Sequence, residues 1–132
     1  MFEYTQPKNE KDIKCDNDCM VRAVTNITKE DYNKVHKLMY SNGWRATRRN
    51  SKGKWEDQIT NTLDSLGVKW ERVSFPAIKG EKRMTAQSLV KIDPKGKYII
   101  RVSKHVAALD GGKLLDTWDC SEKCVYFAWK IL

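Results

Sequence analysis

The sequence lacks the hydrophobic segments that membrane-spanning and secreted proteins carry. No apolar run in its 132 residues approaches the ~18–20 residues that a membrane-spanning helix needs. The N-terminal stretch MFEYTQPKNEKDIK is polar and mixed in charge, and it has no apolar core of the kind found in secretory signals. We therefore expect a cytoplasmic protein without a membrane partner.

Histidine and cysteine are both scarce, so few residues are candidates for a catalytic base, a thiol nucleophile or a metal ligand. The chain has two histidines and four cysteines. In a reducing compartment such cysteines serve metal binding or catalysis more often than disulfides, and no pairing can be assigned from the sequence. His36 lies in the middle of a predicted helix, where a surface or packing role is expected. His105 is therefore the stronger candidate for a catalytic imidazole.

Acidic residues are too few to balance the basic ones, and the net charge is +8. This excess favours acidic partners, nucleic acid among them. Residues 44–54 form a predicted basic loop or hairpin between Trp44 and Trp55, in which the cations could neutralise phosphates and the rings could stack on bases. Alternatively the loop is solvated and both tryptophans belong to the core, which we favour for the rings. Beside an active-site cleft, the same loop could select an acidic substrate. Its cations are Arg45, Arg48, Arg49, Lys52 and Lys54.

The hydrophobic pattern predicts helices in the first half of the chain. Apolar residues recur at i, i+3, i+4 and i+7 from Met20 to Ile27, and Asp18 is a candidate N-cap for that helix. Thr28 and Asp31 resemble a capping box that begins a second helix, which Asn42 and Gly43 end. Further helices are expected at 56–66 and 85–91.

Strands dominate the second half. Alternating or apolar segments bounded by turn residues predict strands at 68–73, 98–102, 106–109, 114–118 and 125–131. We find no internal repeat, so we expect one domain over 1–132, with 1–17 as an irregular or extended arm. The predicted class is α+β, with N-terminal helices packed on a C-terminal antiparallel sheet.

Cys19 is placed where a nucleophile would gain most from its surroundings. It opens the first predicted helix, and a helix N-terminus stabilises a thiolate through its dipole and its free N–H groups. The backbone amide of Cys19 could also stabilise an oxyanion, with the side chain of Asn17 as a second candidate donor. Asp18 beside the thiol would raise its pKa and so opposes activation.

A base and an orienting group can be brought together by one hairpin. His105 begins a predicted strand, and a turn at Asp110-Gly111-Gly112 would return the chain alongside it. Counting outward from that turn places Asp116 near the level of His105 or Val106. Asp119 is the alternative orienter if the register differs, and Trp118 is expected to wall the site or the core.

Three segments resemble the papain-like cysteine peptidase superfamily: 18–23 (DCMVRA), 105–108 (HVAA) and 116–119 (DTWD). Within it they are similar to small phage and prophage proteins that are distantly similar to the leader-cleaving bacteriocin peptidases, over about residues 15–130. The resemblance implies a papain-like domain with Cys19 as nucleophile, His105 as base and then acid, and Asp116 as orienter, without a cofactor or metal.

The resemblance further implies a cysteine peptidase, or a related thiol acyl-transfer hydrolase, acting on an amide or isopeptide bond. The substrate would be a protein or peptide, and a phage origin would place it in the cytoplasm of a bacterial host, with a host protein as target. One position departs from the family. A glutamine usually precedes the nucleophile by several residues, but here the nearest is Gln6, and Asn9 or Asn17 would have to replace it.

Two other interpretations stay open. The cysteines form two pairs of x3 spacing, which could build a structural zinc site of four cysteines, Cys15, Cys19, Cys120 and Cys124. A zinc-bound Cys19 could not act as a free nucleophile. The chain could also be a small basic binding protein for nucleic acid or a host protein, with a degenerate triad.

Overall fold

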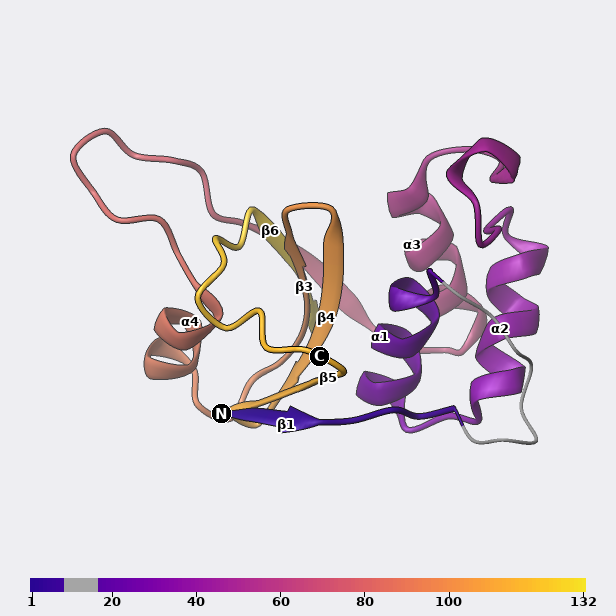
Figure 1. Ribbon diagram of the computed structural model, residues 1–132, viewed down its shortest axis with the longest axis horizontal. Helices are drawn as coiled ribbons and strands as arrows, with labels where there is room; N and C mark the ends of the chain where they lie inside the picture. Colours follow the sequence, from indigo (N-terminus) through magenta and orange to yellow (C-terminus); the bar gives the residue numbers. More distant parts are fainter. Residues whose placement is uncertain (9–16) are drawn as a thin grey trace.

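The computed structural model describes residues 1–8 and 17–132 and contains one six-stranded sheet (Figure 1). The elements in chain order are β1 (Phe2–Tyr4), α1 (Cys19–Thr28), α2 (Tyr32–Ser41), the short 3-10 helix η1 (Arg48–Asn50), α3 (Trp55–Ser65), β2 (Trp70–Ser74), α4 (Ala86–Ile92), β3 (Lys97–Val102), β4 (His105–Asp110), β5 (Lys113–Asp116) and β6 (Phe127–Ile131). Among the described residues, no helix is both long and apolar enough to cross a membrane.

The C-terminal strands pair antiparallel as predicted, but the N-terminal strand β1 makes the whole sheet mixed, which the prediction missed. Its strand order is β1-β5-β4-β3-β6-β2, and β1 pairs with β5 in parallel while the other neighbours are antiparallel. β1 lies within the predicted N-terminal arm and has only three exposed residues, too few for an alternating pattern to reveal it. The α+β class itself, with helices preceding most of the strands, is confirmed.

Two hydrophobic cores lie on opposite faces of the sheet. On one face, α1, α2 and α3 pack through Val24, Val35 and Leu63 against residues such as Ile99. On the other face, α4 and the segment after β5 cover a second set of sheet residues, including Ile100. Figure 1 shows the first three helices on one side of the strands and α4 on the other. The sheet is therefore buried on both faces, and the ends of its central strands approach the start of α1.

The junction between α1 and α2 differs from the prediction. Thr28 ends α1 rather than beginning α2, and Lys29 follows in the left-handed conformation with φ 61°. Asp31 is the N-cap of α2, where its carboxylate accepts a hydrogen bond from the Lys34 backbone N–H at 3.1 Å. The predicted capping box is wrong because Thr28 uses its hydroxyl to donate back to the Val24 carbonyl within α1.

Gly43 lies between α2 and the basic loop, and its carbonyl accepts a hydrogen bond from the Lys52 backbone N–H at 2.8 Å. This position cannot carry a side chain without strain. Its φ is +96°, and an added Cβ would lie 2.4 Å from the Lys52 carbonyl oxygen. We expect Gly43→Ala to lower the free energy of unfolding by about 2 kcal/mol or more, measured by urea denaturation. Gly53→Ala is the matched control, since Gly53 also has positive φ but open space around it. Equal losses in the two variants would contradict this account of the loop.

Candidate active site

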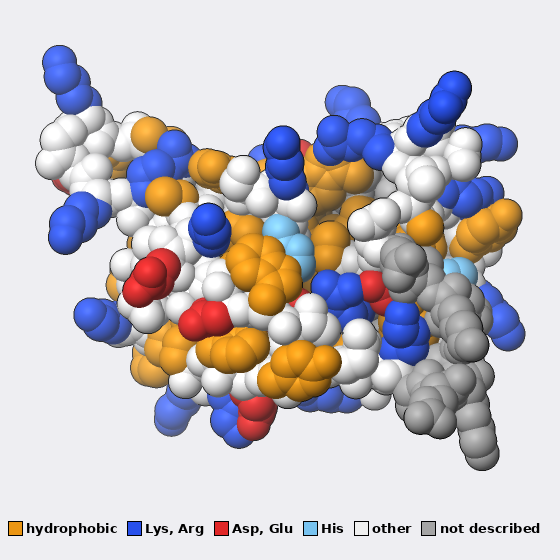
Figure 2. Space-filling view, in the orientation of Figure 1, with side chains coloured by type: hydrophobic (Ala, Val, Ile, Leu, Met, Phe, Trp, Pro, Cys, Tyr) orange, Lys and Arg blue, Asp and Glu red, His pale blue; other side chains and the backbone are white. Residues whose placement is uncertain are grey.

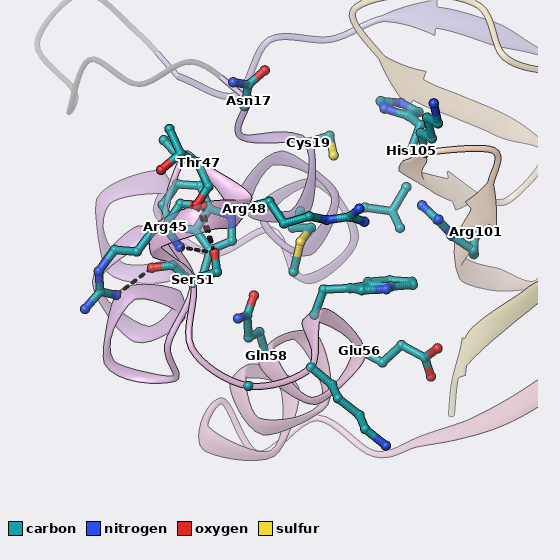
Figure 3. Close-up of a pocket in the computed structure, with 18 residues that line it drawn as sticks. Asn17, Cys19, Arg45, Thr47, Arg48, Ser51, Glu56, Gln58, Arg101 and His105 are labelled. Atoms are coloured by element: carbon teal, nitrogen blue, oxygen red, sulfur yellow. Dashed lines mark hydrogen bonds between the residues drawn. The ribbon is translucent and has the colours of Figure 1, made fainter.

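The three predicted catalytic residues come from three separate elements that meet at one end of the sheet. Cys19 is the first residue of α1, His105 is the first of β4, and Asp116 is the last of β5. His105 and Asp116 are 7% and 3% exposed, so both are shielded from water. Figure 3 shows Cys19 at the start of its helix and His105 on its strand at the same side of a cavity. The structure therefore brings together the residues that the sequence singled out.

The His105 imidazole is held by Asp116. Nε2 of His105 donates to Oδ2 of Asp116 at 2.5 Å. The other carboxylate oxygen of Asp116 accepts from the Thr117 backbone N–H at 2.7 Å. Because Nε2 is used in this way, Nδ1 is the nitrogen left to exchange a proton with the Cys19 thiol.

The two reacting groups favour their charged forms. Burial by itself raises the pKa of the Cys19 thiol, but the His105 imidazole, the Val106 backbone amide and the Arg22 charge together bring that pKa below the ordinary value of 9.0. For His105, burial opposes protonation, yet Asp116 and Cys19 together raise its pKa to about 9. Ionisation of the Cys19 thiol and protonation of the His105 imidazole therefore favour each other.

The hairpin register differs slightly from the count made on the sequence. β4 and β5 pair Asp110 with Lys113 and Ala108 with Leu115, so one further step puts Asp116 level with Ala107. The long imidazole spans the remaining diagonal, which is why the His105–Asp116 bond still forms.

The neighbours of Asp116 have separate roles. Asp119, the alternative orienter, is exposed, and its carboxylate accepts from the Ser121 backbone N–H at 2.9 Å instead. The Trp118 ring lies against His105 with centroids 4.7 Å apart and is 42% exposed. Trp118 therefore walls the imidazole on its solvent side, as predicted, and Asp116 is the carboxylate that orients it.

Of the two candidate donors to an oxyanion, the Cys19 backbone amide is well placed and the Asn17 side chain is not. The first hydrogen bond along α1 runs from the Arg22 N–H to the Asp18 carbonyl, so the Cys19 amide precedes the intrahelical ladder and is available to a ligand. Asn17 is exposed with φ 53°, and Figure 3 shows its side-chain amide pointing away from Cys19. Gln6 bonds the Lys8 backbone N–H, and Asn9 lies outside the described residues.

Asp18 does not behave as the sequence predicts. Its position precedes α1, but its carboxylate makes no capping bond to that helix. Instead it is buried, accepts hydrogen bonds from the Arg22 guanidinium and, at 2.6 Å, from the Tyr32 hydroxyl, and faces Lys8 at 3.6 Å. The positive charges of Arg22 and Lys8 balance the charge of the Asp18 carboxylate. Asp18 is not among the groups that shift the Cys19 pKa.

Arg22 is a site residue that the sequence reasoning missed. It bonds Asp18, and its Nη2 lies 3.6 Å from Oδ1 of Asp116. Arg22 thus links the start of α1 to the end of β5 and helps to fix the distance between nucleophile and orienter. The i, i+4 spacing of Asp18 and Arg22 on a predicted helix was the signal that could have found it.

One group of metal-ligand type side chains forms among the described residues, and it overlaps the triad. His105, Asp116 and Cys120 place their ligand atoms within 4.8 Å of one another. Burial, with further contributions from Asp116 and Asp119, raises the pKa of the Cys120 thiol to about 12, so this thiol is neutral. A metal ion there would have to replace the His105–Asp116 bond.

The alternative zinc site of four cysteines is not assembled in the described part of the chain. That metal-ligand group contains Cys120 but neither Cys19 nor Cys124, and Cys15 lies outside the described residues. Cys19 lies instead against the imidazole of His105.

A cavity of about 790 Å³ opens beside Cys19 and His105, and part of the predicted basic loop lines it. Arg45, Arg48 and Lys54 line this cavity, whereas Arg49 and Lys52 do not. Figure 2 shows Lys and Arg side chains spread along the upper edge of this face.

The tryptophans that flank the loop belong to the core more than to the surface. Trp44 is 3% exposed, which confirms the core interpretation for that ring. Trp55 is half-buried and stacks on Phe127 with ring centroids 5.9 Å apart.

The chain matches no protein-family model, no curated protein and no solved structure.

Proposed function

We propose that this protein is a papain-like cysteine peptidase or a related thiol acyl-transfer hydrolase that acts on an amide or isopeptide bond of a protein or peptide. The observation that carries the proposal is the Cys19–His105–Asp116 constellation. Its thiol pKa is lowered, its imidazole pKa is raised to about 9, and its carboxylate is bonded to that imidazole at 2.5 Å. Cys19 and His105 line the same cavity, and a cleft with ionisable groups whose pKa values are shifted by specific partners is typical of an active site.

The first half of the reaction forms a thioester. The Cys19 sulfur attacks the carbonyl carbon, and the negative charge that develops on the carbonyl oxygen is met by the free amide at the start of α1. The C–N bond then breaks, and the proton on Nδ1 of His105 passes to the leaving amine. Asp116 keeps the imidazole in the orientation and tautomer that this transfer needs.

The second half regenerates the thiolate. A water molecule gives a proton to the now neutral His105 and attacks the thioester carbon, and the C–S bond breaks to release the acid. If another nucleophile replaces water, the same steps give acyl transfer. The cavity beside Cys19 and His105 leaves room for this second reactant.

The papain-like assignment is supported by the order and placement of the elements. The nucleophile begins α1, this helix packs on β4, and β4 with β5 carries the base and the orienter. A phage origin, a host protein as target and a bacterial cytoplasm as location are proposed on the sequence resemblance.

Peptide cleavage followed against pH tests the proposal. Thiolate attack requires Cys19 to lose its proton, so kcat/KM should rise as the pH climbs through a thiol pKa below 9.0. Leaving-group protonation requires the His105 imidazolium, so kcat/KM should fall as the pH passes about 9. A complex peptide mixture, analysed by mass spectrometry, serves as the unbiased substrate.

The control is Cys19→Ala, which should produce none of the new peptide ends. Identical peptide patterns from the wild-type chain and from this variant at every pH would contradict the proposed activity.

A further inference from the structure

The cavity beside Cys19 carries an excess of positive charge. Among the described residues that line it, the Asp, Glu, Lys and Arg side chains are one acid, Glu56, and five cations, Arg45, Arg48, Lys54, Arg101 and Lys104. The Glu56 carboxylate is already bonded to Arg72 at 2.6 Å. Among the described lining residues, the Lys and Arg cations therefore outnumber the carboxylates that could balance them.

Arg48 and Arg101 are the cations that face the interior of the cavity. Figure 3 shows their guanidinium groups extending toward each other from η1 and from β3. Among the described residues, neither has an ion-pair partner within 4.0 Å. Arg45, by contrast, donates to the Tyr40 and Trp44 carbonyls and lies over the Tyr40 ring, so its charge is directed elsewhere.

Two converging guanidinium groups repel each other. Burial lowers the pKa of Arg101, and the charge on Arg48 lowers it further, whereas the Cys19 thiolate and Glu56 raise it. A carboxylate placed between Arg48 and Arg101 would relieve this repulsion and could accept paired N–H bonds from either fork. Arg101 is held in place by the Trp55 ring, 4.5 Å below it, so little side-chain freedom would be lost on binding.

We propose that this cavity selects an acidic peptide segment, with the carboxylate of an Asp or Glu side chain bound by Arg48 and Arg101 next to the bond presented to Cys19. The reference to a reacting bond rests on the proposed function, whereas the affinity for a carboxylate does not. The volume of about 790 Å³ suits a short peptide segment. Arg48 and Arg101 are thus specificity-determining residues.

Nucleic acid fits the same cavity less well. Base stacking needs an open aromatic face, but Trp44 is buried, and Trp55 is covered by Phe127 and by Arg101. Arg48 and Arg101 also converge on one point in the cavity, whereas a nucleic-acid backbone needs charges spaced along a track.

Two alkylating reagents that differ in charge test the proposal without a substrate. Both reagents alkylate the Cys19 thiolate with loss of iodide. Iodoacetate transfers a carboxymethyl group and carries a carboxylate, whereas iodoacetamide transfers a carbamidomethyl group and is uncharged. For each thiol we divide the alkylation rate with iodoacetate by the rate with iodoacetamide. We expect this rate ratio to be about threefold or more higher for Cys19 than for free glutathione. The ratio for Cys19 should fall as salt is added, because salt screens the attraction between the carboxylate and the arginines. Mass spectrometry of the Cys19 peptide provides both rates.

Matched variants locate the effect. Arg48→Gln and Arg101→Gln should each lower the Cys19 rate ratio toward that of glutathione. Arg49→Gln removes the same charge from the same short helix η1 outside the cavity, and it should leave the ratio unchanged. Arg48 is exposed, so its replacement should leave the fold intact even if the Arg101 variant proves less stable.

The outcomes separate this inference from the proposed function. A fast reaction of Cys19 with iodoacetamide, combined with a glutathione-like ratio in every variant, would overturn the inference and leave the nucleophile in place. Slow iodoacetamide reaction would instead contradict the proposed function. Glu-containing peptides should protect Cys19 better than Gln-matched ones, and protection by a short oligonucleotide but not by the Glu peptide would also overturn the inference.

Discussion

Replacing His105 with alanine is expected to slow the alkylation of Cys19 by iodoacetamide at pH 7 by about tenfold or more. The imidazole is the main group that offsets the effect of burial on the Cys19 pKa. Without it, burial dominates, and the thiol becomes less ionised than the few per cent of an ordinary cysteine at this pH. Peptide cleavage should fall further, by roughly 10³-fold or more, because the leaving amine also loses its proton donor.

The chain provides its own controls for this experiment. His36→Ala removes the other histidine, whose ring on α2 lies against Trp44 with centroids 5.2 Å apart. This variant should leave the alkylation rate of Cys19 unchanged. Cys124 is half-buried and unpaired, and its peptide serves as an internal reference in the same spectra. Equal Cys19 rates in wild type and His105→Ala would mean that the imidazole does not activate the thiol.

Replacing Arg22 with methionine is expected to cost roughly 3 kcal/mol of unfolding free energy, measured by urea denaturation. The Arg22 side chain is 13% exposed and lies between two carboxylates, Asp18 and Asp116, that are each 3% exposed. Methionine keeps the helix propensity and most of the volume but removes the charge, so a buried negative charge loses its nearest positive partner.

The matched control for Arg22→Met is Lys34→Met. Lys34 also pairs with an acid four residues earlier, Glu30, at 3.2 Å, but that pair is exposed to solvent. Its loss should cost about 0.5 kcal/mol or less. Similar losses in the two variants would show that Arg22 contributes no more than a surface ion pair.

The closeness of His105 and Asp116 could be predicted from the sequence, because a short turn sets how their two strands pair. Gly111 and Gly112 both adopt positive φ, which suits the two-residue hairpin between β4 and β5. Once the turn is located, the alternation of strand side chains places the two residues near each other even if the count is one position out.

Other parts of the site depend on contacts that no local pattern records. Arg48 and Arg101 are 53 positions apart, and tertiary packing brings their elements to one cavity; in it Trp55, at the start of α3, stacks on Phe127 and lies against Arg101. The parallel pairing of β1 with β5 likewise joins residues from the two ends of the chain. Asn17 was proposed from its position in the sequence, but its left-handed backbone directs the side chain away from the thiol.

The measurement that tests the central claim most directly is an NMR titration of the two histidine imidazoles. We expect His105 to keep its proton to about pH 9, because Asp116 and the Cys19 thiolate stabilise the imidazolium. We expect His36 to titrate below its ordinary 6.5, chiefly because burial disfavours its charge. In Cys19→Ala, the His105 pKa should fall while Asp116 keeps it above that of His36. If both imidazoles titrate together near pH 6.5, and Cys19→Ala shifts neither, then the thiolate–imidazolium pair does not exist and the proposed catalytic site is contradicted.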